Sequence, residues 1–311
     1  MNLLWRLILG TILVATLVGL CWADARLDHP GWVLLPIAVA LSVLAADELC
    51  SLAAERGLRP HRAATLSATA AIVASGGMVV YWPLTGAAYP VDCAIGKLGW
   101  PLSAAALATM FSFIVEMRRY RAPGESIANI AAATLSYLYV GVFMALLVQL
   151  RLLGGANGGA NGGANGGANG AAAGLLPLVS LVAVVKACDV GAYTFGRLFG
   201  RHKMSPVISP GKTLEGAAGG VALACAASYL TLWSMGTADA TRGVGWLIFG
   251  VVVGITGMFG DLAESLLKRD AGRKDSSRWM PGFGGVLDIL DSILFAAPVA
   301  YLLWAAGVVR P

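Results

Sequence analysis

The chain has 311 residues, of which 58% are hydrophobic and only 13% are charged, and its mean hydropathy is +0.74. A soluble domain is about half apolar and about a quarter charged, so this composition excludes a disordered chain, a disulfide-stapled secreted module and an ordinary cytosolic enzyme. The formal net charge is +5, which in a membrane protein reflects loop orientation and suits anionic lipids rather than nucleic acid. The sequence therefore predicts an all-α, polytopic helical membrane protein.

Apolar runs of the length that a membrane-spanning helix needs follow one another along the chain. We expect about nine transmembrane helices, near residues 4–23, 31–47, 63–83, 98–117, 127–150, 174–189, 214–235, 244–260 and 286–309. The second and sixth runs are short, which favours tilted or partly interfacial helices. The first run has an alternative interpretation as a signal peptide, because Arg6 precedes its core and Ala23-Asp24-Ala25 resembles a cleavage site.

The loops between these runs differ in their content of Lys and Arg. With this set of spans, the N-terminus and every second loop after it hold most of the 22 Lys and Arg residues. The positive-inside rule places that side in the cytoplasm. We therefore predict a cytoplasmic N-terminus and an external C-terminus.

A repeat divides the chain into two parts. Residues 154–169 read Gly-Gly-Ala-Asn four times, a composition that favours a flexible external loop because it contains nothing that packs. We predict an N-terminal transmembrane region of about five spans at 1–153, a Gly/Ala/Asn-rich flexible loop at 154–173 and a C-terminal catalytic transmembrane region at 174–311.

Ionisable side chains at membrane depth cost about 2.5–3.5 kcal/mol each on insertion scales, so each of them needs a reason. The first part has few of them: Asp47 and Glu48 end the second run, and Glu116 ends the fourth. We favour interfacial placement for all three. A polar cavity is the alternative for Glu48.

The C-terminal part places acids and bases together at the predicted cytoplasmic face. Asp261 and Glu264 are three residues apart, as are Asp288 and Asp291, so each pair projects from one face of a helix. Acids that share a face repel each other unless a cation lies between them. Such a cluster is typical of a divalent cation that bridges phosphates, and ion pairing with nearby bases is the alternative. Those bases are Lys268, Arg269 and Lys274.

Two further segments favour phosphate binding. Ser209-Pro210-Gly211-Lys212-Thr213 is not a P-loop, because Pro206 stands where the first glycine is needed and no strand is expected before it. Lys212 at a helix start opposes the macrodipole and favours an anion, whereas the hydroxyls of Ser209 and Thr213 either contact phosphate or cap the helix. The glycine-rich segment 281–285 either presents backbone N–H groups to phosphate or only allows close packing.

These segments resemble phosphatidate cytidylyltransferases, the CDP-diacylglycerol synthases, over roughly residues 180–300. The residues in register with that family's signature are Ser265, Lys268-Arg269, Lys274-Asp275, Ser277, Met280-Pro281-Gly282, Gly284-Gly285-Val286, Asp288 and Asp291, with Asp189 and the run Ser209–Gly216 upstream. There are two departures from the pattern: Phe283 replaces the family's His, and Ile289 replaces an Arg.

The resemblance implies a reaction of CTP with phosphatidic acid that gives CDP-diacylglycerol and pyrophosphate for phospholipid synthesis. It also implies Mg²⁺ as cofactor, with a second cation as an open alternative, and a homodimer among membrane lipids. It implies a bacterial-type inner (cell) membrane with the active site facing the cytoplasm. The implied metal ligands are Asp261 and Asp288, with Asp291, Asp189 and Glu264 as second choices. The implied catalytic residues are Asp261, Asp288, Lys268 and Lys274, and the implied substrate-binding residues are Ser209, Lys212, Thr213, Arg269, Gly284 and Gly285.

Three alternatives stay open at this point. A related CTP-dependent enzyme that acts on another lipid phosphate would carry the same polar motifs. An inactive relative is suggested only by Phe283 and Ile289. A transporter would spread its acids through the spans, whereas here they gather at one predicted membrane face.

Overall fold

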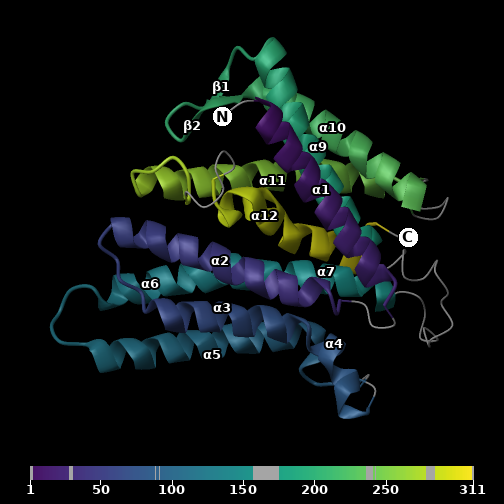
Figure 1. Ribbon diagram of the computed structural model, residues 1–311. Coiled ribbons are helices and arrows are strands. Elements are labelled where there is room, and N and C mark those ends of the chain that lie inside the picture. The colour runs from purple at the N-terminus through teal and green to yellow at the C-terminus, as the bar shows by residue number, and fades with distance from the viewer. Residues whose placement is uncertain are drawn as a thin grey trace. The chain divides into compact units, whose positions relative to one another are not determined.

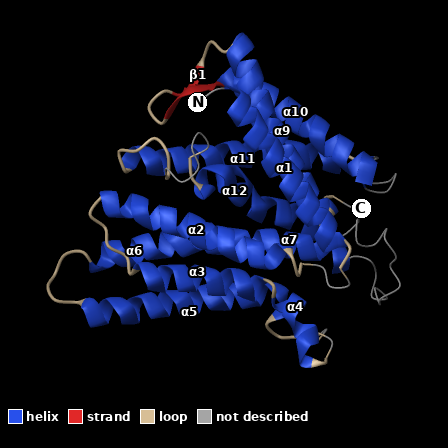
Figure 2. Cartoon of the chain, viewed as in Figure 1, coloured by secondary structure: helices blue, strands red, loops and turns tan. Residues whose placement is uncertain are grey.

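The computed structural model describes residues 3–27, 31–87, 89–90, 92–156, 175–235, 241, 243–277 and 284–309. Helices dominate this part of the chain, with one short β hairpin (Figures 1 and 2). The chain divides into two compact units. Unit 1 comprises Met1–Gln149 and Ala271–Ile289, and unit 2 comprises Leu150–Asp270 and Leu290–Pro311. Most of the predicted flexible loop at 154–173 lies outside the described residues.

Unit 1 is built from the first helices of the chain. They are α1 (Leu3–Ala25), α2 (Leu34–Glu55), α3 (Arg62–Gly76), α4 (Met78–Tyr81), a 3₁₀ turn (Trp82–Thr85), α5 (Gly96–Arg119), α6 (Ser126–Ser136), a π-helical segment (Tyr137–Val142) and the start of α7 (Phe143–Ala156).

Unit 2 contains the end of α7 and the elements that follow it. They are α9 (Leu176–Phe199), β1 (Lys203–Ser205), β2 (Ser209–Thr213), α10 (Leu214–Met235), α11 (Gly245–Asp270) and most of α12 (Val286–Ala305). The first residues of α12, up to Ile289, belong to unit 1.

Each expected apolar run contains a helix, and the polytopic membrane class is confirmed. Among the described residues, seven helices are long and apolar enough to cross a membrane: α2, α5, the continuous segment Ser126–Leu153, α9, α10, α11 and α12. The count of about nine is not confirmed. α3 has only 15 residues, which is short for a span, and α1 (23 residues) is not among the seven.

Small side chains and buried hydrogen bonds hold unit 1 together. Ala68 and Ile72 of α3 pack with Ala105 of α5 and the fully buried Tyr137. The Tyr137 hydroxyl donates to Oγ1 of Thr109 at 3.0 Å, so the polar end of the ring is satisfied inside the core.

The start of α2 is capped from the end of α1. The carboxylate of Asp24 is completely buried and accepts hydrogen bonds from the backbone N–H groups of Gly31 (3.0 Å), Val33 (3.2 Å) and Leu34 (3.4 Å). An anion at this position satisfies donors that the helix leaves unpaired.

In unit 2, glycines bring the helix backbones into contact. A Cβ at Gly220 of α10 would lie 2.9 Å from the carbonyl oxygen of Cys188 in α9, and one at Gly250 of α11 would lie 2.6 Å from Cα of Cys225. Larger side chains would separate these helices, as is usual for small-residue contacts in membrane proteins.

Two helices extend further than the apolar runs predict. The runs end near residues 189 and 260, but α9 continues to Phe199 and α11 to Asp270. Side-chain contacts one turn apart lie within both extensions: the Arg197 guanidinium donates to the Tyr193 hydroxyl at 3.1 Å in α9, and Lys268 pairs with Glu264 at 2.6 Å in α11. As a result, the predicted site acids of both segments lie within helices rather than in loops.

The sequence predicts no strand before the segment Ser209–Thr213, and this prediction is wrong. β1 and β2 form an antiparallel hairpin in which Lys203 lies opposite Thr213 and Ser205 lies opposite Ser209. The strands are short, and β2 contains Pro and Gly, which disfavour strands, so the sequence carries little signal for them.

Candidate active site

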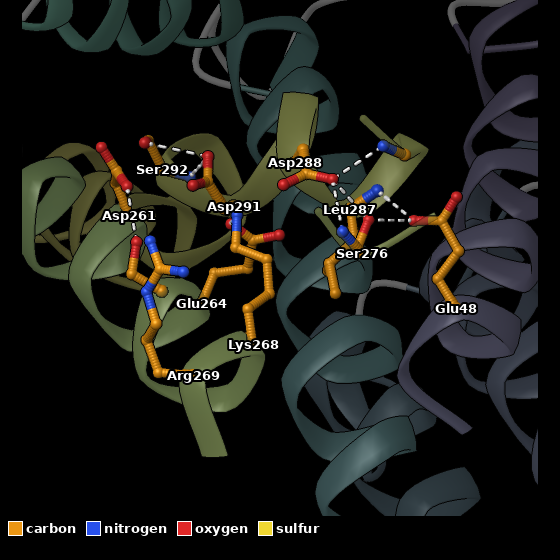
Figure 3. Close-up of polar contacts among 12 residues, drawn as sticks. Glu48, Asp261, Glu264, Lys268, Arg269, Ser276, Leu287, Asp288, Asp291 and Ser292 are labelled. Carbon is orange, nitrogen blue, oxygen red and sulfur yellow. Dashed lines mark hydrogen bonds and ion pairs between the residues drawn. The ribbon is translucent and has the colours of Figure 1, made fainter. Parts of the chain in front are cut away.

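In unit 2, the end of α11 lies against α12 because Gly260 has no side chain. A Cβ there would lie 2.6 Å from Cβ of Phe295, 2.8 Å from the carbonyl oxygen of Asp291 and 3.0 Å from Cα of Ser292. The next residue of α11 is Asp261, so two of the predicted metal ligands, Asp261 and Asp291, come from closely packed segments of α11 and α12 (Figure 3).

Asp261 is held by a lysine from the hairpin. The Nζ atom of Lys212 in β2 lies 2.8 Å from Oδ2 of Asp261, and the Ser265 hydroxyl donates to Oδ1 at 3.4 Å. The Asp261 side chain is 40% exposed and the Lys212 side chain 22% exposed. The structure thus brings a predicted phosphate-binding cation and a predicted metal ligand into direct contact at an accessible position.

One turn further along α11, Glu264 and Lys268 form a buried ion pair. Nζ of Lys268 lies 2.6 Å from Oε2 of Glu264, and only 12% and 1% of the two side chains is exposed. Ion pairing, the alternative to metal binding, is therefore confirmed for Glu264. Loss of either partner would leave a charge buried without its counter-ion, which is costly.

The two remaining acids of unit 2 have different partners. Asp291 is 5% exposed, and its Oδ1 accepts hydrogen bonds from the backbone N–H (2.5 Å) and the hydroxyl (3.0 Å) of Ser292. Asp189 pairs with Lys186 on its own helix. Both carboxylates therefore already have donors or a cation beside them.

Asp288 belongs to unit 1 and lies in the first turn of α12. Its Oδ2 accepts hydrogen bonds from the Ser276 hydroxyl (2.5 Å), the Ser276 N–H (3.0 Å) and the Gly285 N–H (2.7 Å). Gly284 has a φ of +84°, and a Cβ on it would overlap the Asp288 carboxylate. A glycine is therefore needed at 284 both for the turn and for the approach of Asp288.

Glu48 of α2 is a site residue that the sequence interpretation missed. Its Oε1 accepts from the Val286 N–H at 2.9 Å, and its Oε2 accepts from the Leu287 N–H at 3.0 Å and the Ser276 hydroxyl at 2.8 Å (Figure 3). The residue is 8% exposed and therefore buried within unit 1, and its interfacial depth in the membrane stays a prediction. The available signal was an acid inside an apolar run.

The hairpin residues have distinct local roles. Thr213 is buried, and its Oγ1 accepts from the Gly216 N–H at 3.1 Å, so the helix-capping alternative is confirmed for this residue. Ser209 pairs with Ser205 in the hairpin. A phosphate contact by either predicted hydroxyl stays a prediction.

The other predicted substrate contacts are spread over both units. Arg269 Nε donates to the carbonyl oxygen of Ile208 at 3.4 Å, next to β2, and Lys274 is exposed in the segment 271–277. In the glycine-rich segment, the Gly285 N–H is taken by a carboxylate rather than left open, so phosphate binding by Gly284 and Gly285 stays a prediction. Phe283 lies outside the described residues.

The donor set of these acids fits a hard divalent cation, because Mg²⁺ prefers oxygen ligands. Within the described ranges, no group of three or more His, Cys, Asp or Glu residues is placed to hold a metal ion. Mg²⁺ is usually held by one or two carboxylates together with substrate phosphates and water, so a pair of acids suffices. The convergence of Asp261 and Asp288 on one ion stays a prediction.

Comparison with known proteins identifies the family of the chain. The Cytidylyltransferase family matches residues 4–306. The phosphatidate cytidylyltransferase of Synechocystis sp. is 29% identical over 302 residues, which cover 93% of this chain and 94% of that protein. The phosphatidate cytidylyltransferase of Haemophilus influenzae is 42% identical over 127 residues, 40% of this chain and 44% of that protein. The uncharacterized protein YnbB of Escherichia coli is 41% identical over 131 residues, 41% of this chain and 42% of that protein.

The latter two alignments span less than half of each relative, whereas the family match and the Synechocystis alignment extend over nearly the whole chain. The agreement therefore includes the helices of both units and is not limited to the polar signature of the C-terminal part. On this basis, the chain belongs to the cytidylyltransferase family.

Proposed function

We propose that this protein is a CTP:phosphatidate cytidylyltransferase, which makes CDP-diacylglycerol and pyrophosphate from CTP and phosphatidic acid. The observation that carries the proposal is the similarity to the Synechocystis enzyme over 93% of the chain, together with acids and bases that match the family signature. The contact between Lys212 and Asp261 supports it, because it joins a phosphate-binding type of residue to a metal-binding type.

The proposed reaction needs little proton transfer by protein side chains. An oxygen of the lipid phosphate attacks the α-phosphorus of CTP, and the bond from that phosphorus to the oxygen bridging to the β-phosphorus breaks, which releases pyrophosphate. The attacking oxygen is already anionic, so no strong base is needed. The main difficulty is to bring two polyanions together in line, which is a matter of positioning and charge.

The basic side chains provide the positioning. Lys212, Lys268, Arg269 and Lys274 bind the triphosphate or the lipid phosphate, and Lys212 exchanges its contact with Asp261 for phosphate oxygens when substrate arrives. Asp261 and Asp288 are the principal candidates to hold Mg²⁺, with Asp291 and Asp189 as further candidates. When bound, Mg²⁺ neutralises charge on the phosphates and on the leaving pyrophosphate.

One substrate is dissolved in water and the other lies in the membrane, so the site has to be reached from both. In this proposal the nucleotide enters from the cytoplasm, the side that the positive-inside rule favours for the cluster. The acyl chains of the lipid stay in the bilayer, so the lipid reaches the site from the side, between helices.

A substrate panel tests the proposal. The protein, purified in lipid nanodiscs, is given radiolabelled CTP and Mg²⁺ with phosphatidic acid, with an isoprenoid phosphate, or with no lipid phosphate. We expect labelled CDP-diacylglycerol and an equal amount of pyrophosphate with phosphatidic acid alone. Product with the isoprenoid phosphate only would instead identify a related lipid enzyme, and no product with either would identify an inactive relative.

A further inference from the structure

No side chain directly before α12 can cap its first turn. The two residues before Val286 are Gly284 and Gly285, which have no side chains. A helix leaves its first N–H groups without partners, and Ser, Thr, Asp or Asn just before the helix usually supplies an acceptor. Another part of the chain has to provide that acceptor here.

Glu48 provides it from a position more than 200 residues earlier in the sequence. It accepts from two successive N–H groups, those of Val286 and Leu287, one with each carboxylate oxygen. A Cβ on Gly285 would overlap Oε2 of Glu48 and Oγ of Ser276, so the glycine allows this approach. The negative charge also lies at the positive end of the helix dipole.

Asp288 completes the cap. It is the third residue of α12, and its Oδ2 reaches back to the Gly285 N–H, as the acidic residue of a capping box does. The same oxygen accepts from the Ser276 N–H and hydroxyl. These contacts all fall on Oδ2, so together they fix the direction of the Asp288 carboxylate.

The Ser276 hydroxyl links the two acids. It lies 2.8 Å from Oε2 of Glu48 and 2.5 Å from Oδ2 of Asp288, and Ser276 is 1% exposed. A hydroxyl carries one hydrogen, so it donates to one carboxylate at a time. A change at Glu48 therefore alters both the backbone and the hydroxyl that hold Asp288.

From these contacts we infer that Glu48 is a positioning residue that sets the orientation of Asp288 through Ser276 and the first turn of α12. The inference rests on the proposed function, in which Asp288 holds the metal. Glu48 contacts neither substrate nor metal in this account. Groups that orient metal ligands typically contribute about 10–100-fold to metal affinity or activity.

The test uses the full-length protein in nanodiscs and three variants: Glu48→Gln, Ser276→Ala and the double variant. Glu48→Gln keeps the shape but replaces one acceptor oxygen by an NH₂ donor, which faces an N–H. Glu116→Gln is the matched control, because Glu116 is also 8% exposed in unit 1 but accepts from Asn129. Two quantities are measured: the affinity for Mn²⁺ alone, by electron paramagnetic resonance, and kcat and KM for CTP.

We expect Glu48→Gln and Ser276→Ala each to weaken Mn²⁺ binding and to lower kcat by about 10–100-fold, with the KM for CTP near the wild-type value. The double variant is expected to be no worse than the more severe single variant, because both changes act on Asp288. A Glu48→Asp variant, which keeps the carboxylate, should recover part of the loss. Glu116→Gln should bind Mn²⁺ as the wild type does.

Other results would overturn the inference. One is a Glu48→Gln protein that melts at a lower temperature but binds Mn²⁺ and turns over like the wild type, which would make Glu48 a structural cap only. Another is a wild-type protein that binds no Mn²⁺. Failure of the proposed function is a separate result: Mn²⁺ affinity that depends on Glu48, in a protein that transfers no cytidylyl group to phosphatidic acid.

Discussion

Lys212 and Asp261 form an ion pair across two elements, with Nζ of the β2 lysine 2.8 Å from Oδ2 of the α11 aspartate. The pair places a cation beside an acid in the part of unit 2 that carries the family motifs. It neutralises the carboxylate while no other cation is bound, and it holds the hairpin near α11.

Replacement of Lys212 by Met is expected to lower kcat/KM for CTP by about 100-fold, because a charge-assisted contact to phosphate of about 3 kcal/mol is lost. Steady-state assays with phosphatidic acid measure this value. Lys203→Met is the matched control, since Lys203 is an exposed lysine of the same hairpin. Equal losses in the two variants would show that only the general positive charge of the hairpin matters.

Gly260→Ala is expected to lower stability by about 1–3 kcal/mol, because the added methyl group overpacks the contact between α11 and α12. Turnover should fall as well, since Asp261 and Asp291 depend on that contact. Thermal unfolding in nanodiscs and the CTP assay measure the two effects. Gly19→Ala in α1 is the control, because a Cβ at Gly19 meets nothing within 4 Å. An unchanged melting temperature for Gly260→Ala would contradict the packing described for α11 and α12.

Thr213→Val removes the cap of α10 while keeping the shape of the side chain, so we expect a loss of about 1 kcal/mol in stability. Thr213→Ser keeps the hydroxyl and should be close to the wild type. Melting temperatures of the two variants test the cap. If Thr213→Val is as stable as Thr213→Ser but has a higher KM for CTP, the hydroxyl serves substrate binding in preference to capping.

The sequence is sufficient to predict the membrane class and the location of every main helix, because hydropathy over a span of 20 or so residues is a strong signal. It is insufficient at helix ends. The runs predict that α11 ends near residue 260, whereas charged pairs such as Glu264 and Lys268 extend it to Asp270. Polar residues end an apolar run without ending a helix.

For a related reason, the sequence predicts only part of the candidate site. Acids at a spacing of three residues indicated which side chains share a helix face, and Asp288 and Asp291 do lie one turn apart on α12. The sequence does not predict the hydrogen-bond partners that come from distant parts of the chain. Nothing in the sequence around Glu48 indicates that it caps a helix beginning at Val286, because that contact depends on how α2 packs against the start of α12.

The most direct test of the account is the yield of CDP-diacylglycerol from labelled CTP and phosphatidic acid by the Asp288→Asn variant, with and without Mg²⁺. The wild type should form product only with Mg²⁺. The variant keeps an oxygen that can accept from the Gly285 N–H, so it should melt close to the wild-type temperature yet lose at least about 100-fold in product formation. A folded Asp288→Asn protein with wild-type turnover, or a wild type equally active in EDTA, would contradict the assignment of Asp288 as a metal-binding catalytic residue.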